Sequence, residues 1–526
     1  MKPYKVFFIC GLVLTTMSCD KDLLNTVPKD RLASELFWKT EEDAVFAANG
    51  IYSILGDQWR YASMDAFTDI GHFILQWRAE SEVEKHTFDA SNNVIANEWS
   101  YYYTIIRASN NFLENVDLIT EMNEELRNRL KAEARVLRAF SYVNLVMLYG
   151  AVPLVTTGLD AEEAKSLTRT PAGEIWDFVA AELTSAANDL PTVQGDKGRI
   201  TKGAALGIKA RGMLYAERYD EAKSAARAVM ELGVYDINDS YKDLFDYSGE
   251  NSSEIIFARQ YAKNIQPHSI FAFFTANSLF SQQCQVVPTK PLVDAYLMKS
   301  TGLPIDDPSS GFNPATPYAD RDPRLYHTVY LNGDVLPNGK ALNTLPGSGT
   351  GDDITISAEN VTSTGWYFKK YVSEEDYSDP WNCGVNLIYL RYAEVLLTYA
   401  EASVELGEID QSVLDVLNEI RGREDVAMPD VTTTEQNELR QLVRRERMVE
   451  LAMEGHRLFD IRRWGIGEST IRGTVKGMTY ENSNGNYVTV ELTGYVKEFD
   501  ADKHYLWPIP FRERNLNTNL TQNPGF

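Results

Sequence analysis

The 526-residue sequence has few of the residue patterns that usually carry catalysis. Its six histidines and four cysteines are scattered, with neither the HExxH motif nor the ligand spacing of a zinc site. The nucleophile motif GxSxG, the phosphate-binding GxxxxGKS/T loop and the dinucleotide-binding GxGxxG motif are absent as well. These absences predict that the protein is not an enzyme and needs no cofactor and no catalytic metal. The acidic pairs Asp306-Asp307 and Asp352-Asp353 lack the EF-hand spacing and are predicted to be solvated turns, with a structural calcium left open as the alternative. A glycan hydrolase stays as an alternative, because its paired carboxylates have no fixed spacing.

Positive charge is also scarce. The sequence has 51 Lys and Arg against 75 Asp and Glu, a formal net charge of −24 at pH 7. This excess disfavours nucleic acid and, more weakly, densely anionic polymers as ligands. Beyond the N-terminal segment no apolar run is long enough to span a bilayer. Two cysteines lie outside that segment, Cys284 and Cys383, and the sequence leaves open whether they form a disulfide.

The first 18 residues have the pattern of a secretory signal peptide. Lys2 and Lys5 form a short basic region before an apolar stretch at residues 6–14. Ser18 then stands immediately before Cys19. In bacterial lipoproteins such a cysteine is acylated, and the lipid anchors the protein without a spanning helix. Three residues before the cysteine a threonine replaces the usual leucine, so an ordinary signal peptide with a chance cysteine is the alternative. We predict lipidation at Cys19.

Most of the remaining sequence shows the apolar periodicity of helices. Two segments also carry small residues twelve positions apart, Ala210 with Ala222 and Ala400 with Ser412, the spacing of tetratricopeptide-like helical hairpins. Polar and turn-forming residues dominate residues 56–97 and 249–380, where we predict irregular loops. The expected fold is therefore mostly α, with helical hairpins and a large loop-rich insertion. The clearest single helices span residues 40–55, 99–119, 124–149 and 171–190.

Several helix ends can be placed from capping residues. Thr40 with Asp43, and Thr432 with Glu435, have the spacing of a capping box, in which each residue accepts from the backbone of the other. Gly150 is a typical residue at which a helix ends. These signals predict helices that begin near residues 40 and 432 and one that ends near residue 150.

Residues 444–465 combine an apolar helical stripe with an unusual density of charge. Glu446, Glu450 and Glu454 are spaced four apart, so all three would lie on one helix face, where neighbouring arginines can neutralise them. The carboxylates could act with the nearby histidine and aspartate as an acid–base cluster, or they could form a structural ion network. The structural interpretation is favoured, because several arginines lower carboxylate pKa values whereas a general acid needs a raised one.

Four segments spread over nearly the whole chain resemble the SusD/RagB family, the nutrient-capturing outer-membrane lipoproteins of Bacteroidetes. They are residues 130–155, 390–421 and 444–465, and the C-terminal segment with Trp-Pro-Ile-Pro at 507–510 and Gln-Asn-Pro-Gly at 522–525. The resemblance implies a SusD-like α-α superhelix. It also implies a signal peptide (1–18), an N-terminal helical region (19–240) and a C-terminal RagB/SusD region (241–526).

The same resemblance implies a function in nutrient uptake and polysaccharide utilisation. The lipid-anchored protein would sit on the outer membrane, facing the exterior. It would bind oligosaccharides and deliver them to a TonB-dependent transporter of the SusC type. The RagB branch of the family captures peptides, so a peptide ligand is an alternative.

The candidate ligand site follows from carbohydrate chemistry and the positions of the tryptophans. Sugar rings stack their C–H faces on aromatic planes, while polar side chains meet the hydroxyl groups. Five of the nine tryptophans lie in helical or terminal segments and are expected in the core. The predicted ligand residues are the other four, Trp59, Trp77, Trp366 and Trp381, with Tyr377 and the polar residues Asp65, Arg78 and Asn382. Trp77 and Trp381 rank first, because polar residues adjoin each of them.

Overall fold

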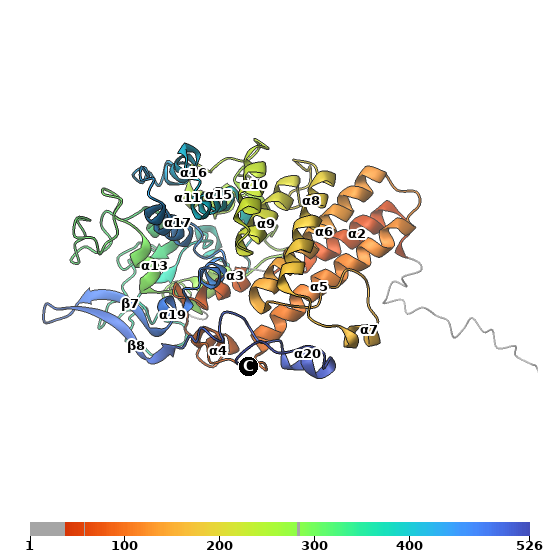
Figure 1. Ribbon diagram of the computed structural model, residues 1–526. Helices are drawn as coiled ribbons and strands as arrows, with labels where there is room; N and C mark the ends of the chain where they lie inside the picture. The colour runs from red at the N-terminus through yellow and green to blue at the C-terminus, as the bar shows by residue number, and fades with distance from the viewer. Residues whose placement is uncertain (1–36, 57, 281–283) are drawn as a thin grey trace, which may run out of the picture.

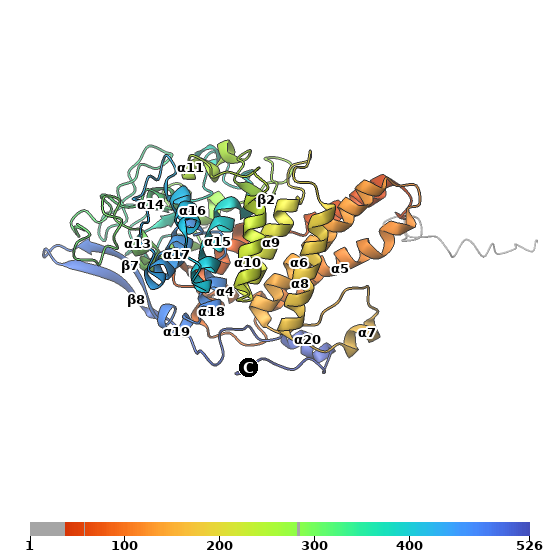
Figure 2. The ribbon, with the colours of Figure 1, turned by 45° about the horizontal axis from the view of Figure 1, so that its top comes forward.

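The computed structural model describes residues 37–526 except residues 57 and 281–283. Its long helices pack against one another largely in sequence order, from α5 through α6, α8, α9 and α10 to α15, which also contacts α16 and α17 (Figures 1 and 2). This arrangement confirms the predicted helical superhelix. The long helices are α2 (Glu41–Ser53), α5 (Asn93–Asn115), α6 (Glu124–Tyr149), α8 (Ala172–Asp189), α9 (Lys202–Tyr215), α10 (Tyr219–Met230), α15 (Tyr392–Leu406), α16 (Gln411–Arg421) and α17 (Gln436–Glu450).

Capping residues place most of these helix ends where the sequence indicates. Thr40 and Asp43 form the expected capping box at α2, and Gly150, with φ +70°, ends α6. The capping box predicted at Thr432 and Glu435 is wrong. Helix α17 starts at Gln436 with Glu435 as its N-cap, and the Glu435 side chain makes no cap hydrogen bond. The hydroxyl of Thr433 instead accepts from the Glu435 amide, so this threonine supports a turn before the helix.

The segment predicted as loop-rich, 249–380, contains short elements joined by long turns. The strands of the described residues form antiparallel pairs: β1 (Gly71–Phe73) with β3 (Val286–Pro288), β2 (Ile255–Arg259) with β6 (Leu387–Arg391), β4 (Val329–Tyr330) with β5 (Tyr367–Phe368), and β7 (Gly473–Glu481) with β8 (Tyr487–Lys497). The β7–β8 hairpin projects at the left of Figure 1, on the side opposite α2 and α5. The loop-rich region thus covers one end of the helical array.

Shorter helices complete the fold. They are α3 (Gln58–Ala66), α4 (Ala79–Lys85), α7 (Ala161–Ser166), α11 (Tyr241–Leu244), α12 (Ile270–Phe274), α13 (Lys290–Ala295), α14 (Arg324–Thr328), α18 (Arg457–Arg463), α19 (Gly467–Thr470) and α20 (Phe511–Leu516), with the 3-10 helices η2 (Val116–Leu118), η3 (Tyr247–Gly249) and η4 (Glu374–Asp376).

Both cysteines of the described region, Cys284 and Cys383, are buried free thiols.

The prediction of surface loops over residues 56–97 is wrong. This segment forms α3, β1 and α4, and its residues Phe67, Ile70 and Phe73 are buried. The partners that bury it come from distant sequence, since β1 pairs with β3 and α3 contacts α18. The segment's weak periodicity therefore reflects contacts on several sides rather than exposure to solvent.

The carboxylates of residues 444–465 are buried in an ion network. Glu446 and Glu450 lie on α17, whereas Glu454 follows it in a turn, so the three do not share one helix as expected. Arg391 donates to both Glu450 (2.7 Å) and Glu454 (2.7 Å), and Arg423 donates to Glu450 (2.8 Å). The cations therefore come from other elements. The arginines nearest in sequence pair elsewhere: Arg447 with Asp460, and Arg463 with Asp460 and Glu401.

The electrostatics of this network favour the structural interpretation. Burial alone would raise the pKa of Glu450, but Arg423, Arg391 and Arg324 outweigh it and hold that pKa well below its ordinary value. At Glu454, burial again raises the pKa, but the charges of Arg391 and Lys370 outweigh this effect and lower the pKa to about 2. Neither carboxyl can donate a proton near neutral pH, so neither suits general acid catalysis.

A buried histidine in the same region gives a pH-dependent prediction. Burial lowers the pKa of His456 from 6.5 to about 4, although Glu394 opposes the shift. Below pH 6.5 the unfolded chain binds a proton that the folded chain does not bind until about pH 4, so stability falls as pH falls through that window. Between pH 7.5 and pH 5 the wild type should lose about 2 kcal/mol more stability than His456→Gln.

Urea denaturation of both proteins at the two pH values measures this difference. Other titrating groups are common to both chains and cancel in the comparison. Equal losses in the two proteins would show that His456 is not held neutral in the fold.

Candidate functional site

Three of the predicted aromatic side chains are exposed at the surface. Trp77, Trp381 and Tyr377 have 72%, 42% and 38% of their surface accessible. The indole nitrogen of Trp77 donates to the Glu359 carboxylate (3.0 Å), which fixes the ring in orientation. Such exposed and oriented rings are uncommon, because a free aromatic face normally becomes buried in folding.

The ring of Trp381 is held by two phenylalanines. It packs edge-on against Phe273 and Phe280, with ring centroids 5.9 and 5.7 Å away. The adjacent Asn382 anchors the loop by accepting from the Asn264 amide (2.7 Å) and donating to the Asn264 side chain (2.9 Å). These contacts make Trp381 a fixed platform, with one part of its surface free.

Trp59 lies beneath this surface and connects it to Arg78. Its ring packs 5.2 Å from Phe273, and the Arg78 guanidinium lies 5.2 Å over the Trp59 ring. Arg78 also donates to Glu80 and to Gln285. Since Arg78 follows Trp77 directly, a continuous set of contacts runs from Trp77 through Arg78, Trp59 and Phe273 to Trp381. Tyr377 adjoins this set through α12, since its ring lies 6.4 Å from Phe271 on the helix that also carries Phe273. We call the three exposed rings, Trp77, Trp381 and Tyr377, the aromatic face.

Two predicted residues lie in the interior. Trp366 is buried, and its indole nitrogen donates to the Tyr318 hydroxyl (2.9 Å). Asp65 is buried and accepts from the amides of Gly455 (3.2 Å) and Arg457 (3.3 Å), while burial raises its pKa to about 7. Neither side chain can contact a ligand at the surface, so neither belongs to the aromatic face. Asp65 instead fixes the turn before α18.

Sequence reasoning missed the residues that support the exposed rings. Phe273 and Phe280 hold Trp381, Asn264 holds its loop, and Glu359 holds Trp77. The run Ile-Phe-Ala-Phe-Phe at α12 is the one local signal, since so apolar a stretch inside a polar segment indicates a packed layer.

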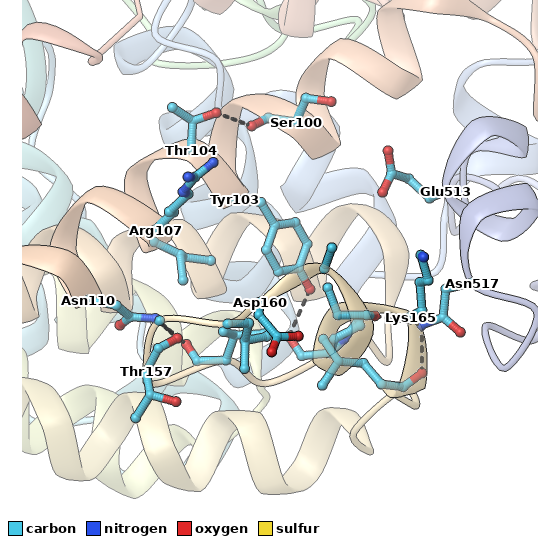
Figure 3. A pocket seen from close by; sticks show the side chains of 18 of the residues that line it. Ser100, Tyr103, Thr104, Arg107, Asn110, Thr157, Asp160, Lys165, Glu513 and Asn517 are labelled. Carbon is cyan, nitrogen blue, oxygen red and sulfur yellow. Dashed lines mark hydrogen bonds between the residues drawn. The ribbon is translucent and has the colours of Figure 1, made fainter. Parts of the chain in front are cut away.

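A large cavity, about 1370 Å³, lies elsewhere, between α5, the chain around α7 and the C-terminal helix α20 (Figure 3). None of the predicted ligand residues lines it. Its polar groups are largely engaged within the protein: Tyr103 donates to the Pro153 carbonyl (2.8 Å), and Asn110 donates to the carbonyls of Val155 and Thr157. Trp99 in its wall is buried, so the cavity offers no exposed tryptophan ring.

Together, the superhelix of hairpins and a loop-rich end with exposed, braced tryptophans define a helical protein with a surface suited to binding. Residues 253–526 match the family model described as "SusD family", and residues 50–214 match one described as "Starch-binding associating with outer membrane". The chain belongs to the SusD family.

Individual relatives match most or all of the chain. The SusD-like protein P2 of Formosa agariphila is 28% identical, with 100% of each chain covered. The starch-binding protein SusD of Bacteroides thetaiotaomicron is 26% identical, over 82% of this chain and 78% of that protein. The crystal structure of a SusD-like carbohydrate-binding protein from Bacteroides fragilis superimposes with a TM-score of 0.84 at 30% identity, covering 92% of this chain and 100% of that chain.

The description of one matching family model mentions the outer membrane. Within the described part of the chain, no helix has both the length and the apolar character to cross a membrane. The predicted lipidation site, Cys19, lies outside the described residues.

Proposed function

We propose that this protein binds oligosaccharides on the aromatic face formed by Trp77, Trp381 and Tyr377. The observation that carries the proposal is the state of Trp381, whose ring is braced by two phenylalanines yet remains 42% exposed. A rigid aromatic plane with free surface suits stacking against a sugar ring. Arg78 and Asn382 lie beside the two tryptophans in sequence, and Asn382 holds the Trp381 loop from within the protein.

The comparisons support a carbohydrate as the ligand. One matching family model is described as starch-binding, and the Bacteroides fragilis relative as carbohydrate binding. A catalytic role has less support, because the clustered carboxylates Glu450 and Glu454 pair with buried cations that keep them ionised. Peptide capture, as in the RagB branch, is the remaining alternative.

Calorimetry of the pure protein against panels of oligosaccharides and of peptides tests the proposal. We expect binding to at least one glycan class, without release of shorter products on long incubation. Turnover of a glycan would establish a hydrolase, and binding confined to peptides would replace the carbohydrate proposal.

We further propose that the protein is anchored in the outer membrane through a lipid on Cys19, faces the exterior, and passes its ligand to a SusC-like TonB-dependent transporter. The segment before α2 would then be the tether. Co-purification of such a transporter with the tagged full-length protein tests the partnership.

The anchoring proposal gives its own prediction. Cys19→Ala should release the protein from the membrane fraction, because an acyl anchor is the only membrane attachment proposed. Cell fractionation followed by immunoblotting measures the share of the protein in the membrane fraction. Cys10→Ala, which keeps the anchor, is the control. Absence of label on the wild-type protein after growth with a palmitate probe would refute lipidation.

A further inference from the structure

A second, smaller cavity lies next to the loop that holds Trp381. Its volume is about 320 Å³, at the lower end of the range for ligand pockets and suited to a single sugar unit. The end of α2 and the following residues form one wall, residues 196–199 form another, and the end of β2 with the turn after it forms the third. Among the side chains that line it are Asp196, Lys197, Arg199, Arg259, Gln260 and Gln266.

Arg259 in this cavity has no acidic partner among the described residues. Its guanidinium donates to the Leu55 carbonyl and lies 4.9 Å from the centre of the Tyr261 ring. No ion pair joins it to any carboxylate of the residues that the structure describes, and the same holds for Lys197. Arg199 differs, since it pairs with Glu133 (2.9 Å) and Asp196 (3.2 Å).

Lys197 is attracted by the Glu250 carboxylate without forming an ion pair, so Arg259 is the less compensated of the two cations in a chain of net charge −24. Arg391 and Arg423 in the core are neutralised by two or more carboxylates. The buried Arg321 and Arg462, like Arg259, are instead held by backbone carbonyls and an aromatic ring, and Arg259 in addition lines a cavity. A guanidinium held by a backbone carbonyl and an aromatic ring keeps N–H groups for a planar anionic partner. The cavity is therefore arranged to accept one negative group.

The cavity and the aromatic face share one structural element. After β2 the chain makes a tight turn in which Ala262 pairs with Gln266, and Gln266 lines the cavity. Asn264 in the same turn holds Asn382, the neighbour of Trp381. Ile265, between Asn264 and Gln266 in this turn, is 86% exposed.

We propose that this cavity binds the carboxylate or sulfate group of an acidic sugar unit, so that the ligand is a glycan bearing anionic groups. The inference rests on the proposed function, because the charged unit would belong to the glycan that stacks on the aromatic face. Arg259 and Lys197 provide the positive charge, and the amides of Gln260 and Gln266 meet the hydroxyl groups. One small cavity accommodates one charged sugar unit, so the expected glycan carries acidic groups only at intervals along its length. This agrees with the net negative charge of the protein, which disfavours densely anionic polymers.

Ligand-detected NMR with glucuronate, glucose 6-sulfate and glucose tests the cavity directly. We expect at least one charged probe to bind at least tenfold tighter than glucose, and the preference to weaken as NaCl is raised. Preference for glucuronate would identify a uronic acid and preference for glucose 6-sulfate a sulfate ester. No preference of either kind would overturn the proposal.

Two variants assign the effect to the cavity. Arg259→Gln and the exposed Lys197→Gln should each reduce the preference, while Arg472→Gln, an exposed arginine on another surface, should keep it. An unchanged preference in Lys197→Gln and in a folded Arg259→Gln would overturn the assignment. If uncharged oligosaccharides bind through Trp381 without any charge preference, this inference fails and the proposed function stands. If no glycan binds at all, both fail.

Discussion

Glu450→Gln is expected to destabilise the protein by about 3–5 kcal/mol, the cost of breaking a buried ion pair. The Glu450 carboxylate is fully buried and accepts from Arg324 (2.8 Å), Arg391 (2.7 Å) and Arg423 (2.8 Å). Glutamine has nearly the same shape but no charge, and its amide group is a donor where the arginines need an acceptor. Three buried guanidinium groups would then share too little negative charge. A loss of this size is a large part of the 5–15 kcal/mol that stabilises a typical domain.

Urea denaturation or, if yields fall too far, the soluble fraction on expression measures the effect. Glu468→Gln is the matched control. It removes an exposed carboxylate that pairs with Arg472 at 3.0 Å, and the expected change is within about 0.5 kcal/mol. A Glu450→Gln protein as stable as the control, but unable to bind ligand, would contradict the structural role and revive an acid–base role.

Trp77→Ala and Trp381→Ala are expected to weaken glycan binding by roughly 2 kcal/mol each, about thirtyfold in Kd. Both rings are exposed, so their removal leaves the core intact, whereas a sugar stacked on them would lose its main apolar contact. Trp381→Ala also uncovers Phe273 and Phe280, so a small loss of stability accompanies the loss of affinity. Calorimetry with the best glycan of the panel measures both variants.

Tyr487→Ala is a suitable control for these variants. Tyr487 is 44% exposed, but it lies on the projecting β7–β8 hairpin, so its removal should leave affinity unchanged. Trp38→Ala should impair folding and not recognition, because Trp38 packs 5.9 Å from Phe112 in the core. Unchanged dissociation constants in both tryptophan variants would remove the support for the aromatic face.

The helical part of the fold could be predicted because its signals are local. Capping at Thr40 and the end of α6 at Gly150 depend on residues a few positions apart, and both are found as expected. The partners of Glu450 could not be predicted in this way. Arg324, Arg391 and Arg423 lie on different segments, and only the tertiary fold brings them to one carboxylate.

The exposure of the candidate ligand tryptophans also depends on the tertiary fold and could be predicted only in part. The sequence groups Trp59, Trp77, Trp366 and Trp381 because the residues around each are polar and lack helical periodicity. Exposure, however, depends on which distant elements cover a segment. Residues near Trp59 fold into α3 against α18, and Trp366 is enclosed with Tyr318, whereas no such element covers Trp77 or Trp381.

A crystal structure of the protein with the tightest oligosaccharide from the panel tests the central claim most directly. The account predicts sugar rings stacked on Trp77 and Trp381, with an acidic group, where the glycan has one, directed to Arg259. Sugar bound instead in the cavity between α5, α7 and α20, with both tryptophans uncovered, would contradict it.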